Sequence, residues 1–378
     1  MARYFCMDTL RYLLFEVHGA TDLLDYERFE AYDRESFELL LESAKAWADQ
    51  DFYPYYREMD EKPVYFKDGI TYSHPILRKI MKDAGENGWH CPCFDYEDGG
   101  SQMPYTIANA ANHIVESANN NIPGYVNLTS GAAHLIANFG SEELKKKFIP
   151  PMAAGRSGGT MALTEPQAGS SLSDIVTSAS PTTEGHYLIR GQKIFISGGD
   201  HQATDNFVHL TLARIEGAPA GTRGISLFVV PKLRPEEDGT LKHNHVVAVA
   251  DFQKLGQRGY STVHLVYGEH GDCHGYLVGE PHQGLKYMFQ MMNGARIDVG
   301  MTAASTATAA YYASLQYAME RPQGRKLTGS GTKNVSESQS LIIGHPDVRR
   351  MLLLQKAVVE GSLSLLVECS KYADLAHV

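Results

Sequence analysis

The chain has 378 residues and a net charge of −10, from 34 lysines and arginines against 44 aspartates and glutamates. Hydrophobic residues make up 43% and charged residues 21%, which is ordinary for a folded globular protein and excludes disordered, collagen-like and small disulfide-rich chains. The acidic balance predicts that neither nucleic acid nor an anionic membrane is a partner, although one basic pocket for an anionic ligand is compatible with it.

The cysteines and the uncharged stretches predict a cytoplasmic location. Five scattered cysteines and the lack of a secretory leader favour a reducing compartment with free thiols. Residues 117–141 and 299–319 contain no Asp, Glu, Lys or Arg, but they are too rich in polar residues to span a membrane. We expect buried helices with small side chains there, and no membrane segment.

The first part of the chain, to about Arg156, is expected to be mostly helical. Apolar residues recur every three or four positions in residues 29–51, and similar patterns occupy residues 76–84 and 107–119. Asp33 is placed to cap the first of these helices. Ser141 begins a segment with acids first and bases last, as the helix dipole favours, and Pro150-Pro151 is expected to end that helix.

The pattern changes near Gly158 and changes back after Pro281. Between them lie short β-branched and apolar runs broken by Gly, Asp and Pro, such as NFVHLTLARI and STVHLVYG, which predict strands. Helical patterns resume over 285–316 and from 347, with a polar loop at 328–340. We predict an α+β fold with an N-terminal helical domain (1–158), a central sandwich-like or barrel-like β-domain (159–280) and a partial C-terminal helical domain (281–378).

Two short motifs match functional patterns only in part, and we expect neither catalysis nor metal binding from them. The segment GRSGG at 155–159 matches the G-x-S-x-G pattern, but that elbow needs a strand before its serine and a helix after it, and here the order is reversed. We expect a flexible hinge around Ser157. The segment HCPCFD at 90–95 offers half of a zinc site without a second close pair of ligands, so we expect no metal.

Residues 161–174, MALTEPQAGSSLSD, are more informative. They lie where the helical pattern gives way to the β pattern, and they form an irregular run rich in Thr, Ser and Gly. Such loops offer hydroxyl groups and a close approach to the backbone, which suit a cofactor that carries phosphate or carbonyl groups. From composition alone, a plain connecting loop is the alternative.

This segment resembles the TEPxAGS flavin loop of the acyl-CoA dehydrogenase family. Further segments match family motifs in the same order: GQKIFISGG, KLGQRGYSTVHLVYGE, YLVGEPHQGLKYMFQMMNGARIDVG and YAMERPQG. The resemblance extends from about Tyr32 to the end of the chain. YLLFE at 12–16 and HPDVRR at 345–350 are similar to the larger branch of the family, which includes broad-range fatty acyl-CoA and 3-methylmercaptopropionyl-CoA dehydrogenases.

The resemblance implies FAD-dependent α,β-dehydrogenation of an acyl-CoA thioester to the enoyl-CoA. In that reaction a base removes the α-proton, a hydride leaves the β-carbon for FAD, and oriented donors stabilise charge on the thioester oxygen. An electron-transferring flavoprotein is the implied electron acceptor, and a homodimer is the implied assembly.

The resemblance also assigns individual residues. Those matched to FAD-binding positions are Leu163, Thr164, Gly169, Ser170, Phe195, Ile196, Ser197 and Arg321. Arg321 would reach the FAD of a neighbouring subunit. Those matched to the acyl-CoA side are Ser170, Asn293 and Arg296. Phe195 and Ser197 replace the family's Trp and Thr, and they keep an aromatic ring and a hydroxyl group at those positions.

No catalytic residue can be assigned, because the family's base has no counterpart. Some branches place a glutamate just before the arginine matched by Arg296, but that residue is Ala295 here, and no Y-E-G-T-like motif follows. Glu360 and Glu368 have no predicted partner that would make them a substitute. We hypothesise a truncated, impaired dehydrogenase; the alternatives are a non-catalytic FAD or acyl-CoA binder and, against the charge balance, the family's DNA-binding relative.

Overall fold

The computed structural model describes residues 4–236, 238–325, 330–333 and 335–378. The chain divides into two compact units. The helical unit consists of Met1–Gln50, Pro104–Asn120 and Ile297–Val378, and the mixed unit consists of Asp51–Met103 and Asn121–Arg296. Among the described residues, no helix combines the length and the apolar character that a membrane crossing requires.

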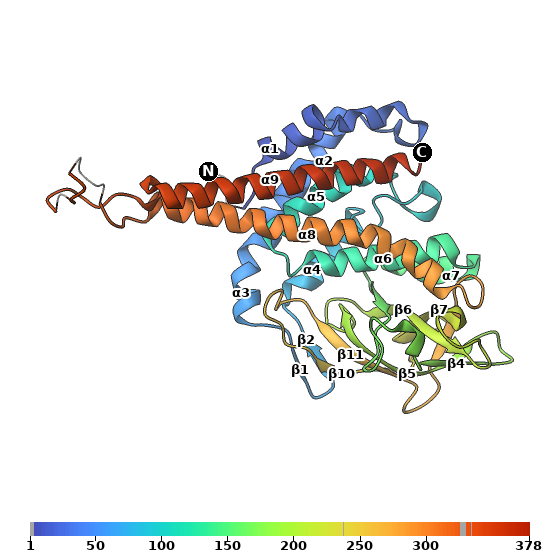
Figure 1. Cartoon of the computed structure of the whole chain (residues 1–378). Helices are drawn as coiled ribbons and strands as arrows, with labels where there is room; N and C mark the ends of the chain where they lie inside the picture. The colour runs from blue at the N-terminus through green and yellow to red at the C-terminus, as the bar shows by residue number, and fades with distance from the viewer. Residues whose placement is uncertain (1–3, 237, 326–329, 334) are drawn as a thin grey trace. The chain divides into compact units, whose positions relative to one another are not determined.

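Helices occur in both units (Figure 1). The α-helices are α1 Met7–Arg11, α2 Arg34–Trp47, α3 Tyr56–Glu61, α4 Ile76–Glu86, α5 Tyr105–Ala118, α6 Pro123–Phe139, α7 Glu142–Ala153, α8 Gly284–Glu320 and α9 Pro346–Leu375. The predicted N-caps are confirmed: Asp33 accepts a hydrogen bond from Ser36 N at 2.7 Å and Ser141 Oγ accepts one from Leu144 N at 3.3 Å. These side chains satisfy amides that a helix leaves unpaired at its start.

Strands lie in the mixed unit. They are β1 Tyr65–Lys67, β2 Ile70–Tyr72, β3 Ser157–Ala162, β4 Ser178–Pro181, β5 Tyr187–Ser197, β6 Asn206–Ile215, β7 Ile225–Pro231, β8 Leu233–Pro235, β9 Leu241–His243, β10 Val246–Asp251, β11 Thr262–Tyr267 and β12 His274–Leu277. The strands predicted from NFVHLTLARI and STVHLVYG are β6 and β11, so the β character of this region is confirmed. The β1–β2 hairpin was not predicted, since it interrupts a helical pattern.

The main sheet closes on itself. Its strand order is β10-β11-β5-β12-β7-β6-β3, and β4 pairs with both β5 and β6. β4, β5, β12, β7 and β6 therefore form a ring, while β10–β11 and β3 extend it on either side. The α+β class is therefore confirmed, with a partly closed, barrel-like sheet whose two ends are β10 and β3.

Two predictions near the start of the sheet are wrong. Ser157 does not lie in a flexible hinge: it is 4% exposed and is the first residue of β3, which runs parallel to β6 from the register pair Ser157↔Asn206. Pro150 and Pro151 do not end α7, which continues to Ala153. A proline lacks only its own donor, and the carbonyls of both still accept bonds, from Ala154 N and Arg156 N.

The helical unit buries polar side chains along α5. Asn109 Nδ2 donates to Ser370 Oγ of α9 at 2.8 Å, and His113 Nδ1 lies 2.9 Å from Ser305 Oγ of α8. The C-terminal part of α8 lies beside α9 (Figure 1), where Tyr311 and Ala318 pack with Leu352 and Val359. Short polar groups that pair across helices in this way satisfy the buried polar atoms of stretches that are uncharged and rich in small residues.

A buried carboxyl group on α5, that of Glu116, and a half-buried one on α8, that of Asp298, lie close together in the helical unit. Glu116 is 4% exposed, accepts a hydrogen bond from Thr302 Oγ1 at 3.0 Å through Oε1, and has no described partner for Oε2. Burial raises the pKa of Glu116 to about 8, the Thr302 bond opposes this, and the charge of Asp298 adds to it. Burial also raises the pKa of Asp298 to about 6, against the hydrogen bond from Tyr105.

We expect Glu116→Gln to stabilise the helical unit at alkaline pH. Because the folded pKa lies above the ordinary value of 4.5, the folded state holds more protons than the unfolded state between about pH 4.5 and 8, and the free energy of unfolding falls as pH rises through that range. Glutamine resembles the neutral acid and removes this loss, so the gain at pH 8.5 should be about 2–4 kcal/mol.

Urea unfolding at pH 5 and pH 8.5 measures the effect. The variant should match the wild type at pH 5 and exceed it at pH 8.5, while exposed Glu35→Gln on α2 should leave both midpoints unchanged. An identical pH dependence in wild type and Glu116→Gln would contradict the assignment.

Candidate functional site

The candidate site is built on the loop that follows β3. Glu165 and Ala168 bond each other's backbone, from Glu165 N to Ala168 O at 2.8 Å and from Ala168 N to Glu165 O at 3.1 Å, and so form a tight turn. Ala168 is buried beneath this turn, whereas Gly169 and Ser170 are exposed. The turn therefore presents the glycine and the serine outward while its base is anchored in the mixed unit.

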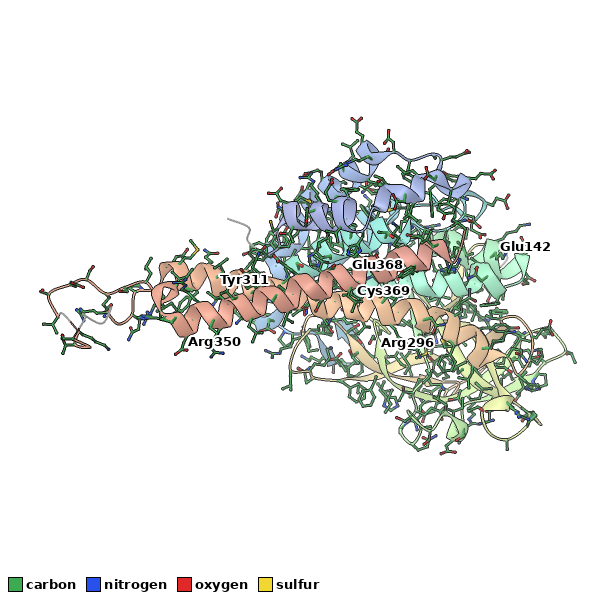
Figure 2. All side chains as sticks on the ribbon, turned by 45° about the horizontal axis from the view of Figure 1, so that its top comes forward. Glu142, Arg296, Tyr311, Arg350, Glu368 and Cys369 are labelled. Atoms are coloured by element: carbon green, nitrogen blue, oxygen red, sulfur yellow. The ribbon has the colours of Figure 1, made fainter. Side chains whose placement is uncertain are left out.

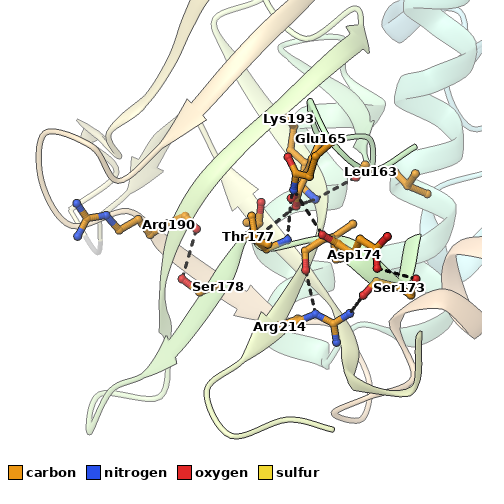
Figure 3. A network of polar contacts seen from close by, with 12 residues as sticks. Leu163, Glu165, Ser173, Asp174, Thr177, Ser178, Arg190, Lys193 and Arg214 are labelled. Carbon is orange, nitrogen blue, oxygen red and sulfur yellow. Dashed lines mark hydrogen bonds and ion pairs between the residues drawn. The ribbon is translucent and has the colours of Figure 1, made fainter. Parts of the chain in front are cut away.

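The carboxylate of Glu165 anchors the loop (Figure 3). Its oxygens accept hydrogen bonds from Lys193 Nζ at 2.8 Å, Val176 N at 2.7 Å, Thr177 N at 3.1 Å and Gln167 Nε2 at 2.8 Å. We call these five residues the Glu165 cluster. The side chains of Lys193 and Glu165 are 0% and 1% exposed, so the ion pair is shielded from water.

Burial and charge act in opposite directions on this ion pair. Burial lowers the pKa of Lys193 to about 8, and Glu165 opposes that shift. Burial also raises the pKa of Glu165, but the charge and hydrogen bond of Lys193 and the backbone amides outweigh it, so the net pKa is lowered. Both groups are therefore charged at neutral pH, and the low-dielectric surroundings strengthen their attraction.

The same cluster joins the loop to β5. Lys193 Nζ donates to Leu163 O at 3.0 Å, and Ile194 N donates to Thr164 O at 2.8 Å. The structure thus brings the predicted positions Leu163 and Thr164 next to the strand that carries the predicted positions 195–197. Two motifs about thirty residues apart in the sequence meet at one place.

Phe195 has an uncommon backbone conformation for its size. Its φ is 58°, in the left-handed region, and its side chain is 55% exposed. Its ring centroid lies 4.4 Å from that of Phe252. Next to it, Ile196 is buried and Ser197 is half-buried, paired with Thr262 of β11. An exposed aromatic ring in a strained conformation is a feature that folding alone does not favour.

A second anchor holds the far end of the loop. The guanidinium of Arg214 on β6 donates to the backbone oxygens of Ser173 at 2.5 Å, Ile175 at 2.9 Å, Pro219 at 3.2 Å and Gly221 at 2.8 Å. Sequence reasoning did not single out Arg214, Lys193 or Glu165 for this role. The glutamate of the motif TEP was the one local hint. Lys193 and Arg214 lie on strands that are distant in the sequence, so no local pattern relates them to the loop.

Asn293 and Arg296 lie together on α8 within the mixed unit. Arg296 Nη1 donates to Asn293 Oδ1 at 2.6 Å, and both side chains are exposed. Figure 2 labels Arg296 on α8. Arg321 belongs to the helical unit, where it follows α8 and is exposed; Ile342 N donates to its backbone oxygen at 2.9 Å. Arg321 is thus not brought together with the loop and β5 residues within one unit.

The residues weighed as bases are either apolar or already paired. Ala295 is half-buried on α8, and its methyl group cannot accept a proton. Glu360 Oε1 accepts from Lys356 Nζ at 2.6 Å. Glu368 Oε2 lies 2.6 Å from His18 Nδ1. The two glutamates therefore have partners within the helical unit, and neither supplies an unengaged carboxylate.

The loop and the end of β5 fit a flavin dinucleotide. A Cβ built on Gly169 would have only Thr164 Cγ2 within 4 Å, at 3.4 Å, so the backbone there is open to a phosphate. Ser170 supplies an exposed hydroxyl group, Thr164 and Ser197 supply half-buried ones, and Phe195 supplies an exposed aromatic face. Phosphate, ring nitrogens and a planar ring system match this set of donors and surfaces.

Two domain models match separate parts of the chain. Residues 34–156 match the model of the acyl-CoA dehydrogenase N-terminal domain, and residues 160–269 match that of the acyl-CoA dehydrogenase middle domain. The chain is 43% identical to the 3-methylmercaptopropionyl-CoA dehydrogenase of Ruegeria pomeroyi over 77% of this chain and 48% of that protein. It is 35% identical to a broad-specificity linear acyl-CoA dehydrogenase of Mycobacterium tuberculosis over 96% of this chain and 60% of that protein.

A solved structure has the same fold. The glutaryl-CoA dehydrogenase of Mycobacterium smegmatis, determined in complex with FADH2, superimposes with a TM-score of 0.71 at 17% identity, over 94% of this chain and 80% of that one. The chain spans about half the length of these two curated relatives, 48% of the first and 60% of the second.

Proposed function

Because the chain belongs to the acyl-CoA dehydrogenase family, we propose that it binds FAD and contributes to the α,β-dehydrogenation of an acyl-CoA thioester to the enoyl-CoA. The observation that carries this proposal is the Glu165 cluster, which joins the loop of Thr164 to the strand of Phe195. The buried ion pair fixes the conformation of an exposed loop, and a fixed conformation is what a ligand-binding loop requires.

In this proposal the residues of the loop and of β5 have separate tasks. Gly169 and Ser170 receive the pyrophosphate, the hydroxyl groups of Thr164 and Ser197 and the backbone of Leu163 meet the polar edge of the ring, and Phe195 and Ile196 shield its surface. FAD, when bound, supplies the acceptor for the hydride from the β-carbon. Asn293 orients Arg296, whose guanidinium pairs with a phosphate of CoA.

The proton on the α-carbon needs a separate base, and we assign none. Ala295 stands where some relatives carry one. Reaction therefore depends on a carboxylate outside the residues assigned here, and the second candidate function is binding of FAD and acyl-CoA without turnover. An electron-transferring flavoprotein as acceptor, Arg321 at the FAD of a second subunit in a homodimer, and a cytoplasmic location complete the proposal.

A visible absorption spectrum tests both functions. The purified chain is mixed with FAD and freed of excess flavin, and acyl-CoA substrates are then added without oxygen. Bound flavin that bleaches supports dehydrogenation and places a base within this chain. Bound flavin that stays yellow supports the binding function alone. A chain that retains no flavin overturns the proposal.

We expect Ser197→Ala to weaken FAD binding about 2–10-fold, the loss that corresponds to one hydrogen bond of roughly 0.5–1.5 kcal/mol. Quenching of flavin fluorescence during a titration measures the affinity without turnover. Ser178→Ala is the matched control, because Ser178 lies on β4 of the same sheet and its Oγ donates to Arg190 O at 3.4 Å, away from the loop. Equal affinities for wild type and Ser197→Ala would remove Ser197 from the site.

A further inference from the structure

We propose that Ser364, His18 and Glu368 form a second chemical site, in the helical unit, in which Ser364 is an activated nucleophile towards carboxylic esters. His18 follows the π-helical turn Tyr12–Val17, and the other two residues stand one turn apart on α9. Ser364 Oγ lies 2.8 Å from His18 Nε2, and Glu368 Oε2 lies 2.6 Å from His18 Nδ1. Figure 2 labels Glu368 on α9.

The ionisation state of Glu368 determines which atom donates in each of these two hydrogen bonds. Hydrogen bonds from His18 and Tyr372 lower the pKa of Glu368, so its carboxylate is ionised at neutral pH and can only accept. His18 Nδ1 must therefore carry the proton. In a neutral imidazole Nε2 is then an acceptor, and the hydroxyl group of Ser364 is its donor. A histidine in this tautomer can take a proton from a serine while a carboxylate orients the ring.

The three side chains are held in place and remain within reach of solvent. Lys371 Nζ donates to the backbone oxygens of His18 at 2.6 Å and Gly19 at 3.0 Å and pairs with Asp22 at 2.7 Å, which fixes the chain around the histidine. The side chain of His18 is 13% exposed and that of Glu368 is 35% exposed, and Ser364 is half-buried. Fixed geometry together with access distinguishes this cluster from a fully buried polar contact.

The proposed reaction is an ordinary two-step hydrolysis. Ser364 Oγ attacks the ester carbonyl carbon while its proton passes to His18 Nε2; the bond to the leaving alcohol breaks, and the alcohol takes that proton. Water then cleaves the acyl-serine, with its proton taken by His18 and returned to Ser364 as the carboxylic acid leaves. Base assistance of this kind contributes about 10²–10⁴-fold. We therefore expect Ser364 to react about 100-fold faster than an ordinary serine.

Labelling of the full chain with a fluorophosphonate probe tests the site, since the Ser364 oxygen would bond to phosphorus as fluoride leaves. We expect one adduct, located at Ser364 by peptide mass spectrometry. His18→Asn should slow labelling about 100-fold and Glu368→Gln about 10-fold. Ser362→Ala, two residues away on α9, should leave the rate unchanged.

Labelling at other serines, no labelling at all, or an unchanged rate in His18→Asn would each overturn the proposal. Circular dichroism establishes that His18→Asn is folded. If it is not folded, Glu368→Gln decides, because it leaves the Ser364–His18 contact in place and removes only the charge that orients the imidazole. The test is independent of FAD, so its outcome does not bear on the proposed dehydrogenation.

Discussion

We expect Lys193→Met to lower the free energy of unfolding of the mixed unit by about 3–5 kcal/mol, the loss measured when one partner of a buried ion pair is removed. The loss arises because Glu165 stays buried after the ammonium group of Lys193 is removed. Glu165 is 1% exposed, and without the ammonium group it must remain charged in a low-dielectric site or take up a proton. Urea unfolding followed by tryptophan fluorescence and circular dichroism measures the change.

Two control variants separate the buried charge from other effects. The double variant Lys193→Met/Glu165→Gln should recover part of the loss, because no charge is left unpaired. Lys82→Met removes an exposed ion pair with Glu86, whose side chains are 71% and 60% exposed, and should change stability by less than about 0.5 kcal/mol. If Lys193→Met cost no more than Lys82→Met, the Glu165 cluster would not be the anchor of the loop.

Asp374→Ala should destabilise the helical unit by about 2–4 kcal/mol. Asp374 is 4% exposed on α9, and its carboxylate accepts from Tyr105 N at 2.7 Å, from Thr106 N at 2.8 Å and from Thr106 Oγ1 at 2.6 Å. Pro104, the residue before α5, provides no side-chain cap, so Asp374 performs that role from the other end of the chain. Alanine removes the acceptor that both amides share, and the amide of Thr106 is buried.

Hydrogen exchange resolves this effect by residue. The amides of Tyr105 and Thr106 should exchange faster in Asp374→Ala, ahead of any change in the mixed unit. Asp374→Asn keeps one acceptor oxygen and should lie between the wild type and alanine. Asp347→Ala, at the exposed start of the same helix, should cost less than about 1 kcal/mol. Unaltered exchange at Tyr105 and Thr106 would show that Asp374 does not cap α5.

The features predicted correctly from the sequence depend on residues that are close together along the chain. Asp33 and Ser141 were recognised as caps because a cap and the amide it satisfies are only three residues apart. The strand at 206–215 was recognised because a run of β-branched and apolar residues between turn residues is enough to indicate it. Pro150 misled the prediction of where α7 ends, since a proline removes only its own amide donor and its carbonyl group still accepts a hydrogen bond, so the helix continues to Ala153.

What the sequence did not predict depends on distant partners. Glu165 and Lys193 are 28 residues apart, and Thr106 and Asp374 are 268 apart, so no periodicity relates them. The family resemblance supplied positions such as Thr164 and Ser197 without saying what holds them. The hydrogen bonds that join Thr164 and Leu163 to β5, through Ile194 and Lys193, became visible only in the folded chain, because they depend on which segments are neighbours.

The anchors of the loop bind it largely through main-chain atoms, and this bears on how freely its sequence can change. Glu165 accepts from the amides of Val176 and Thr177, and Arg214 donates to the carbonyl groups of Ser173 and Ile175. Every residue but proline offers an amide, and every residue offers a carbonyl group. The exposed positions between the anchors can therefore accept many substitutions while the path of the loop stays the same, which makes this loop a natural place to build a library of variants with altered ligand preference.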